Sequence, residues 1–172
     1  MNQIIIQGIG YVALGFVLLS FQKRTRVNIL LVMLTGLVLF VIHFALLHAW
    51  TGALMNAVEA LVVFVAYKKE TMTWAKHKAW PYIFILTYVL VGLLTQHSLI
   101  NSLPIIAQIF GAIAVWQTNP KTIRGLMLIP RPLWFVYNLA VGSYAGMTAE
   151  IVILASVVTG IIRFDILKHE QD

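Results

Sequence analysis

Apolar runs separated by short polar or charged segments follow one another along the whole chain. A helix needs about 20 mostly apolar residues to cross about 30 Å of hydrocarbon. The chain is 60% hydrophobic and 10% charged, whereas a soluble domain is about one quarter charged. We therefore predict an all-α, polytopic membrane protein with seven transmembrane helices, at Ile4–Phe21, Val27–His48, Thr51–Tyr67, Trp80–Gln96, Leu99–Trp116, Gly125–Val141 and Met147–Ile162. The residues before the first run lack the basic region of a signal peptide, so we expect that run to remain in the mature protein.

The positions of the basic residues predict how the chain is oriented in the membrane. Eleven of the twelve Lys and Arg residues lie in every second connection, at Lys23, Arg24, Arg26, Lys68, Lys69, Lys76, Lys78, Lys121, Arg124, Arg163 and Lys168. The connections near residues 49–50, 97–98 and 142–146 contain none. This alternation follows the positive-inside rule for a protein with its N-terminus outside and its C-terminus inside. The net charge of +6 is thus spread over four loops, which argues against nucleic acid as a partner.

The chain also contains a weak internal repeat. The pairs that align are Phe21-Gln22 with Trp116-Gln117, Phe40-Val41-Ile42-His43 with Phe135-Val136-Tyr137-Asn138 and, after a one-residue slip, Trp50-Thr51-Gly52 with Tyr144-Ala145-Gly146. We therefore predict a three-helix bundle in residues 1–67, a cytoplasmic loop and linker helix in 68–98, and a second bundle with a short tail in 99–172. Both bundles begin outside, so the repeat is parallel, with its axis along the membrane normal.

This 3+1+3 plan resembles the SWEET and PQ-loop superfamily, in which a Pro-Gln pair closes the first helix of each triplet. The chain has Gln22 and Gln117 at these places, with Phe21 and Trp116 instead of proline. Three stretches more closely resemble the YgjV-type bacterial inner-membrane proteins of the same superfamily: residues 46–57, Trp134-Phe135-Val136-Tyr137-Asn138 and Ile161-Ile162-Arg163-Phe164. The resemblance implies a location in the bacterial inner membrane.

Glu59, Arg131 and Glu150 are the ionisable acidic and basic residues inside predicted helices. A charge in mid-bilayer is costly, so it faces the bundle interior and has a partner. At about 1.5 Å per residue, Glu59 lies roughly 13 Å from the outer end and Arg131 roughly 10 Å from the inner end. We predict that they form an ion pair near the midplane, either structural or linked to a solute or a proton. Glu150 is expected nearer the outer mouth.

Neutral polar and aromatic side chains extend this candidate site. The resemblance implies that Asn56 lines a solute pocket, and the repeat places Glu150 at the equivalent position. His43 and Asn138 occupy matching positions in the outer half, where His43 either lines the rim of a cavity or is satisfied by a neighbour. Gln108 is a further pocket candidate, and Trp134 is expected to form a pocket wall. Pro130 and Pro132 flank Arg131 and predict either a static kink or a hinge.

The sequence contains no motif for catalysis, for a cofactor or for a metal, so we expect no enzyme. The leading hypothesis is a small-solute transporter with a central site near the midplane between the two repeats. The alternatives are a non-transporting membrane receptor of the PQ-loop type and a structural subunit of a larger complex. Expected partners are a small solute and membrane lipids, and a homo-oligomer is left open.

Overall fold

The computed structural model describes residues 2–69, 71–115, 117 and 119–166. Within these residues every regular element is a helix. The α-helices are α1 (Gln3–Ser20), α2 (Arg26–Leu46), α3 (Trp50–Lys68), α4 (Trp80–Thr95), α5 (Leu99–Val115), α6 (Pro120–Met127), α7 (Pro130–Ala140) and α8 (Tyr144–Ile161), with a 3-10 turn at Trp74–Lys76 and a π-helical turn at Ile162–Ile166. The predicted all-α class is therefore confirmed. Trp116 and Lys168, which belong to the sequence-based predictions, lie outside the described residues.

Side-chain caps define where several of these helices begin. The side chains of Asn2, Thr25, Asn119 and Ser143 each accept a hydrogen bond from a backbone N–H in the first turn of α1, α2, α6 and α8, respectively. Asn, Thr and Ser are favoured at this position because their oxygens satisfy an N–H that has no partner within the helix. The polar segments between the apolar runs thus start the helices as well as separating them.

The predicted single helix at Gly125–Val141 is wrong, because the structure divides it into α6 and α7. Pro130 and Pro132 have no backbone N–H, so they cannot continue the i to i−4 hydrogen-bond pattern. Leu128 and Ile129 instead donate to Gly125 and Leu126 at 3.3 and 3.2 Å, which closes a tighter turn. The break lies immediately before Arg131, so it helps to set the direction in which that side chain leaves the helix.

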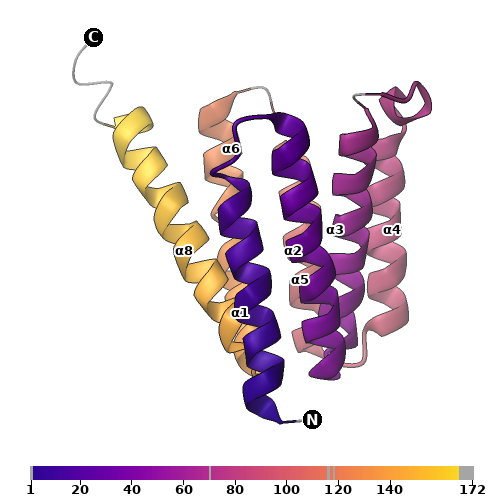
Figure 1. The fold of residues 1–172 in the computed structure, drawn as a ribbon, viewed down its shortest axis with the longest axis vertical. Coiled ribbons are helices and arrows are strands. Elements are labelled where there is room, and N and C mark those ends of the chain that lie inside the picture. The colour runs from indigo at the N-terminus through magenta and orange to yellow at the C-terminus, as the bar shows by residue number, and fades with distance from the viewer. Residues whose placement is uncertain (1, 70, 116, 118, 167–172) are drawn as a thin grey trace.

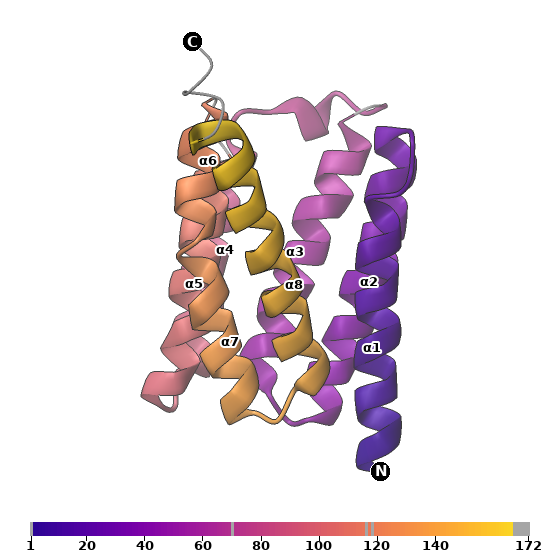
Figure 2. The same ribbon diagram turned by 90° about the vertical axis from the view of Figure 1, so that its left-hand side faces the viewer.

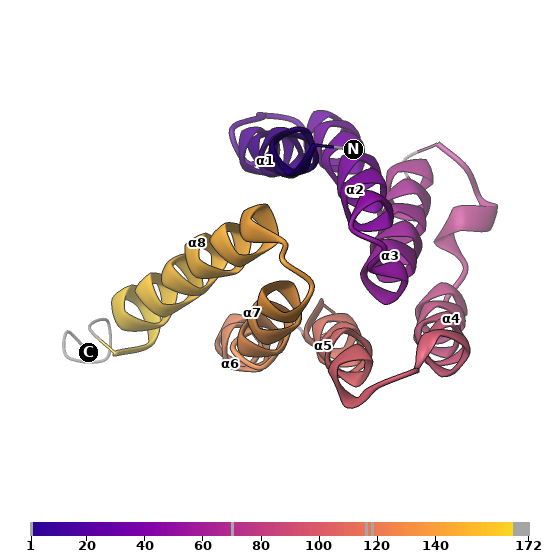
Figure 3. The same cartoon turned by 90° about the horizontal axis from the view of Figure 1, so that it is seen from below.

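The helices form two groups, joined by α4 (Figures 1 and 3). In the first group α2 packs between α1 and α3. In the second group, which includes α6, α7 packs between α5 and α8. The groups meet where α1 contacts α8 and where α3 contacts α5, while α4 contacts both α3 and α5. If α1 is exchanged with α5, α2 with α7 and α3 with α8, the α1–α8 contact becomes the α5–α3 contact, and the reverse. The packing therefore has the pattern of an approximate two-fold arrangement.

The helix lengths and surfaces suit a membrane. Four helical segments are long and apolar enough to cross one: Gln3–Ser20, Arg26–Leu46, Trp50–Lys68 and Tyr144–Ile166. Two shorter apolar helices, Trp80–Thr95 and Leu99–Ala114, accompany them. Large apolar side chains point outward, for example Leu93 and Leu94 of α4, which are 67% and 79% exposed. Seven membrane crossings therefore stay a prediction.

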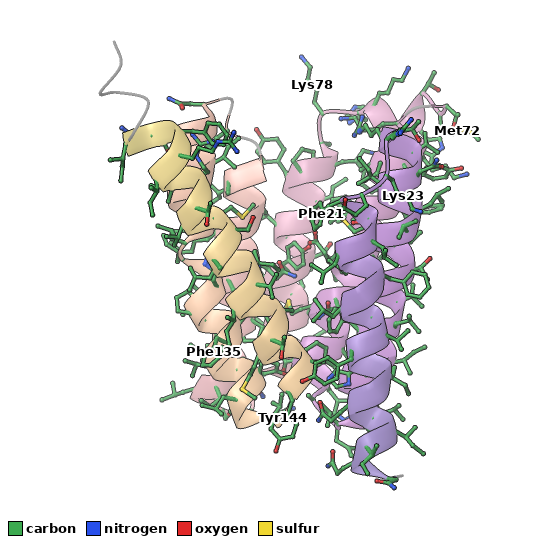
Figure 4. All side chains as sticks on the ribbon, turned by 60° about the vertical axis from the view of Figure 1, so that its left-hand side comes forward. Phe21, Lys23, Met72, Lys78, Phe135 and Tyr144 are labelled. Atoms are coloured by element: carbon green, nitrogen blue, oxygen red, sulfur yellow. The ribbon has the colours of Figure 1, made fainter. Side chains whose placement is uncertain are left out.

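The two ends of the bundle differ in charge. Lys23 and Lys78 lie at one end and Tyr144 lies towards the other, as Figure 4 shows. We call the first the basic end. The second, which we call the N-terminal end, carries the start of α1 and the turns that join α2 to α3 and α7 to α8 (Figure 1).

Candidate functional site

A cavity of about 330 Å³ lies between the two helix groups. In Figure 2, α5 and α7 lie on the left of the molecule, α1 and α2 on the right, and α8 and α3 between them. The wall contains residues from α1, α2, α3, α5, α6, α7 and α8: Leu14, Val17, Met33, Leu37, Phe40, Phe44, Asn56, Glu59, Gln108, Met127, Arg131, Trp134, Asn138, Gly146, Ala149, Glu150 and Ile153. Because both groups contribute, neither group forms this cavity alone.

Most of the wall consists of residue pairs that are 94 positions apart in the chain. These pairs are Leu14 with Gln108, Met33 with Met127, Leu37 with Arg131, Phe40 with Trp134, Phe44 with Asn138, Asn56 with Glu150, and Glu59 with Ile153. Each pair joins one residue of the first group to one of the second. A single constant spacing means that the two groups present equivalent faces to the cavity.

The turns at the N-terminal end have the same spacing. His48 and Gly142 have left-handed backbones, with φ of 56° and 71°. Around His48, Ala49 N–H donates to the Phe44 carbonyl at 2.9 Å; around Gly142, Ser143 N–H donates to the Asn138 carbonyl at 2.8 Å. Both turns are Schellman motifs, in which a left-handed residue ends the helix.

This register corrects part of the predicted repeat. The alignment of Trp50 with Tyr144 and of Asn56 with Glu150 agrees with a spacing of 94. The matching of His43 with Asn138 is wrong, since the turn hydrogen bonds place His43 opposite Tyr137 and Phe44 opposite Asn138. The similar segments Phe-Val-Ile-His and Phe-Val-Tyr-Asn start 95 positions apart, one residue more than the spacing of the structurally equivalent positions.

The predicted ion pair between Glu59 and Arg131 is also wrong. Arg131 Nη1 donates to Glu150 Oε2 at 3.0 Å, and the two side chains are 15% and 11% exposed. Glu59 instead accepts a hydrogen bond from the Tyr88 hydroxyl. Glu59, Arg131 and Glu150 nevertheless all line one cavity. The rotation of each helix, which decides the partner, could not be read from depth.

Tyr88 is a site residue that the sequence reasoning missed. It belongs to α4, outside both helix groups, and it is 1% exposed. A second cavity of about 140 Å³ lies beside the first, and the two share Glu59, Gln108, Met127 and Arg131. Tyr88 lines the second cavity, and its hydroxyl donates to Glu59, a residue that lines both cavities. A single tyrosine in an apolar run gave no signal that would have distinguished it from a core residue.

Four of the five uncharged residues predicted for the site line the larger cavity, and the fifth, His43, does not. Asn56, Gln108, Trp134 and Asn138 all line the larger cavity. Asn56 Nδ2 donates to the Gly52 carbonyl at 2.9 Å. Asn138 is 1% exposed, and its Oδ1 has no hydrogen-bond partner. A buried amide oxygen without a partner is costly.

His43 does not reach the cavity, so its expected place at the rim is wrong. Its ring is fully buried, with Nδ1 2.9 Å from the Ile6 carbonyl oxygen and Nε2 2.8 Å from Ser143 Oγ. Both ring nitrogens are therefore occupied by neighbours. The ring joins α2 to the start of α8, which is the structural alternative considered from the sequence.

One family of known proteins matches the chain over nearly its whole length. Residues 4–168 match the Imp-YgjV family of bacterial inner membrane proteins. The chain belongs to this family. The Imp-YgjV match includes both helix groups and every residue that lines the larger cavity. No curated protein and no solved structure matches the chain.

In this Imp-YgjV member, hydrogen bonds between the two groups close the N-terminal end. Gln7 of α1 donates through Nε2 to the Gly142 carbonyl at 2.7 Å and accepts through Oε1 from Tyr144 N–H at 3.1 Å. Tyr137 of α7 accepts from Gly52 N–H of α3 at 2.8 Å. Together with the contact between His43 and Ser143, these bonds separate the cavity from that end.

At the basic end, Arg124 and Asp165 form an ion pair that joins α6 to the turn after α8. The hydrogen bond from Arg124 to Asp165 raises the pKa of the guanidinium, so this group stays charged. The pair lies within the second helix group. Among the described residues, no cluster of three or more His, Asp or Glu residues could hold a metal ion.

Proposed function

We propose that the protein is a small-solute transporter of the SWEET and PQ-loop type, with seven membrane crossings, the N-terminus outside and the basic end in the cytoplasm. Under this proposal the two helix groups are parallel repeats and the cavity between them is the solute site. Transporters of this kind bind their solute near the midplane, at the interface between repeats.

The observation that carries the proposal is the cavity wall built from residues 94 positions apart. Equivalent positions of two repeats meet there, while hydrogen bonds between the repeats close the N-terminal end. Rocking one group against the other would break these bonds and open that end without changing either group internally. A volume of about 330 Å³ suits a small molecule. A receptor that holds a peptide would need a wide groove open to one side.

The proposal can be tested without knowing the solute. The chain contains no cysteine, so a single cysteine placed at Ile153, an apolar residue of the cavity wall, is the one reactive thiol. We expect a small, membrane-impermeant thiol reagent to modify Ile153→Cys from either side of the membrane, in right-side-out and in inverted vesicles. The control is His97→Cys, in the connection between α4 and α5, which should react from one side. Modification of Ile153→Cys from one side alone would favour a receptor.

A further inference from the structure

The charges that line the larger cavity are unequally matched. Arg131 binds Glu150 at 3.0 Å, so the positive charge is already engaged by one carboxylate. The hydrogen-bond donor that the structure gives to the second carboxylate, Glu59, is the Tyr88 hydroxyl, which is neutral. With two carboxylates and one guanidinium ionised, the wall carries a formal charge of −1. A carboxylate in a membrane interior is stabilised by a neighbouring cation.

The positions of the charges break the two-fold equivalence of the wall. The residue 94 positions after Glu59 is Ile153, and the residue 94 positions before Arg131 is Leu37. Glu59 and Arg131 therefore each have an apolar residue at the equivalent position of the other group. This asymmetry leaves the carboxylate of Glu59 as the group that a bound cation would neutralise.

Aromatic rings line the same cavity. Phe40 and Trp134 are an equivalent pair, and the Phe44 ring centroid lies 6.1 Å from that of Trp134. The faces of aromatic rings attract cations through their quadrupole, most strongly where water is excluded. A carboxylate and aromatic faces are both groups that bind an ammonium ion.

We propose that the cavity binds a small organic cation, a solute with one ammonium group, and that this group is held by Glu59. The inference rests on the proposed function, because it assigns a solute class to the same cavity. It excludes small anions as ligands, since a carboxylate group of the solute would approach Glu59 and Glu150 as a like charge. It also excludes neutral solutes that give Glu59 no compensating charge.

Three probes of similar size and different charge test this assignment: propylammonium chloride, sodium propionate and 1-propanol. The full-length protein in detergent is unfolded by heat with each probe at the same concentration and ionic strength. A ligand that binds the folded state raises the unfolding temperature. We expect propylammonium to raise it in a saturable way and the other two probes to leave it unchanged. The affinity for propylammonium should fall at least tenfold in Glu59→Gln, or about 1.4 kcal/mol.

Two further variants keep the test decisive. Asp165→Asn is the matched control, since it also replaces a carboxylate by an amide but belongs to the ion pair at the basic end; it should retain the response. If Glu59→Gln does not fold, Tyr88→Phe gives a second comparison. It removes the hydroxyl that donates to Glu59, so propylammonium should bind at least as tightly as to the unmodified protein.

The inference is overturned if all three probes act alike, if propionate alone stabilises the protein, or if Glu59→Gln responds to propylammonium as the unmodified protein does. Weaker binding in Tyr88→Phe would also contradict it. These outcomes are separate from the fate of the transporter proposal. Binding of propylammonium with one-sided labelling of Ile153→Cys would leave the cation site and refute transport. Two-sided labelling without a response to propylammonium would refute the cation site alone.

Discussion

Arg131 of α7 and Glu150 of α8 form an ion pair across the second helix group, with Nη1 and Oε2 3.0 Å apart. The pair is largely buried, and Arg131 Nε has no hydrogen-bond partner. The guanidinium is therefore incompletely satisfied by the protein. It connects two helices that belong to the same group, so it stabilises the wall of the cavity and does not close it.

Replacing one member of this pair should destabilise the protein more than replacing both. Arg131→Gln or Glu150→Gln leaves one buried charge without its partner, which costs about 3 kcal/mol. The double variant removes both charges and should recover most of this loss. Thermal unfolding in detergent measures the three variants against the unmodified protein. Additive losses in the double variant would contradict a direct interaction.

The close approach of α1 to the start of α8 should make Gly10 intolerant of a side chain. A Cβ at Gly10 would lie 2.7 Å from the Cβ of Ala145 and 2.8 Å from Cε1 of His43. We expect Gly10→Ala to lower the free energy of unfolding by about 1–3 kcal/mol, because overpacking forces neighbours to move. Gly15→Ala is the control on the same helix, since nothing lies within 4 Å of its added Cβ. It should be neutral or stabilising by up to about 1 kcal/mol. Equal effects of the two would argue against this contact.

The hydroxyl of Tyr137 should contribute to stability through the backbone of α3. It accepts from Gly52 N–H at 2.8 Å, and that N–H belongs to the first turn of its helix. Tyr137→Phe leaves the buried N–H unsatisfied, at a cost of about 1–2 kcal/mol. Tyr144→Phe, at an exposed tyrosine, should change stability by less than about 0.5 kcal/mol. Denaturant or thermal unfolding checks both, and an unchanged Tyr137→Phe would mean that water replaces the hydroxyl.

The alternation of basic and uncharged connections predicts opposite sides for two loops. The chain has no cysteine, so Lys76→Cys and His97→Cys each introduce a single thiol. An impermeant maleimide should label His97→Cys in intact spheroplasts and Lys76→Cys after the membrane is opened. Labelling of both from the same side would mean that the chain does not cross the membrane an odd number of times between Lys76 and His97.

Much of the helical arrangement follows from local chemistry. Six of the seven apolar runs correspond to one helix each, with ends that differ by a few residues, because apolar length and capping residues are local properties. The seventh is split at Pro130, whose missing N–H is also visible in the sequence. The polar residues inside these runs could also be predicted to face the interior from the sequence. A charge or amide in an apolar helix is costly, so it marks the interior wherever it occurs.

The tertiary structure alone decided which of these residues meet. Arg131 was expected to bind Glu59 from their common depth, yet it binds Glu150, while Glu59 receives Tyr88 from the linker helix. Depth depends on the rise of one helix and can be counted along the sequence. Rotation about the helix axis and the order of neighbours depend on how apolar side chains interlock. In a chain that is 60% hydrophobic, many faces of each helix are equally apolar, so only the packed structure selects one.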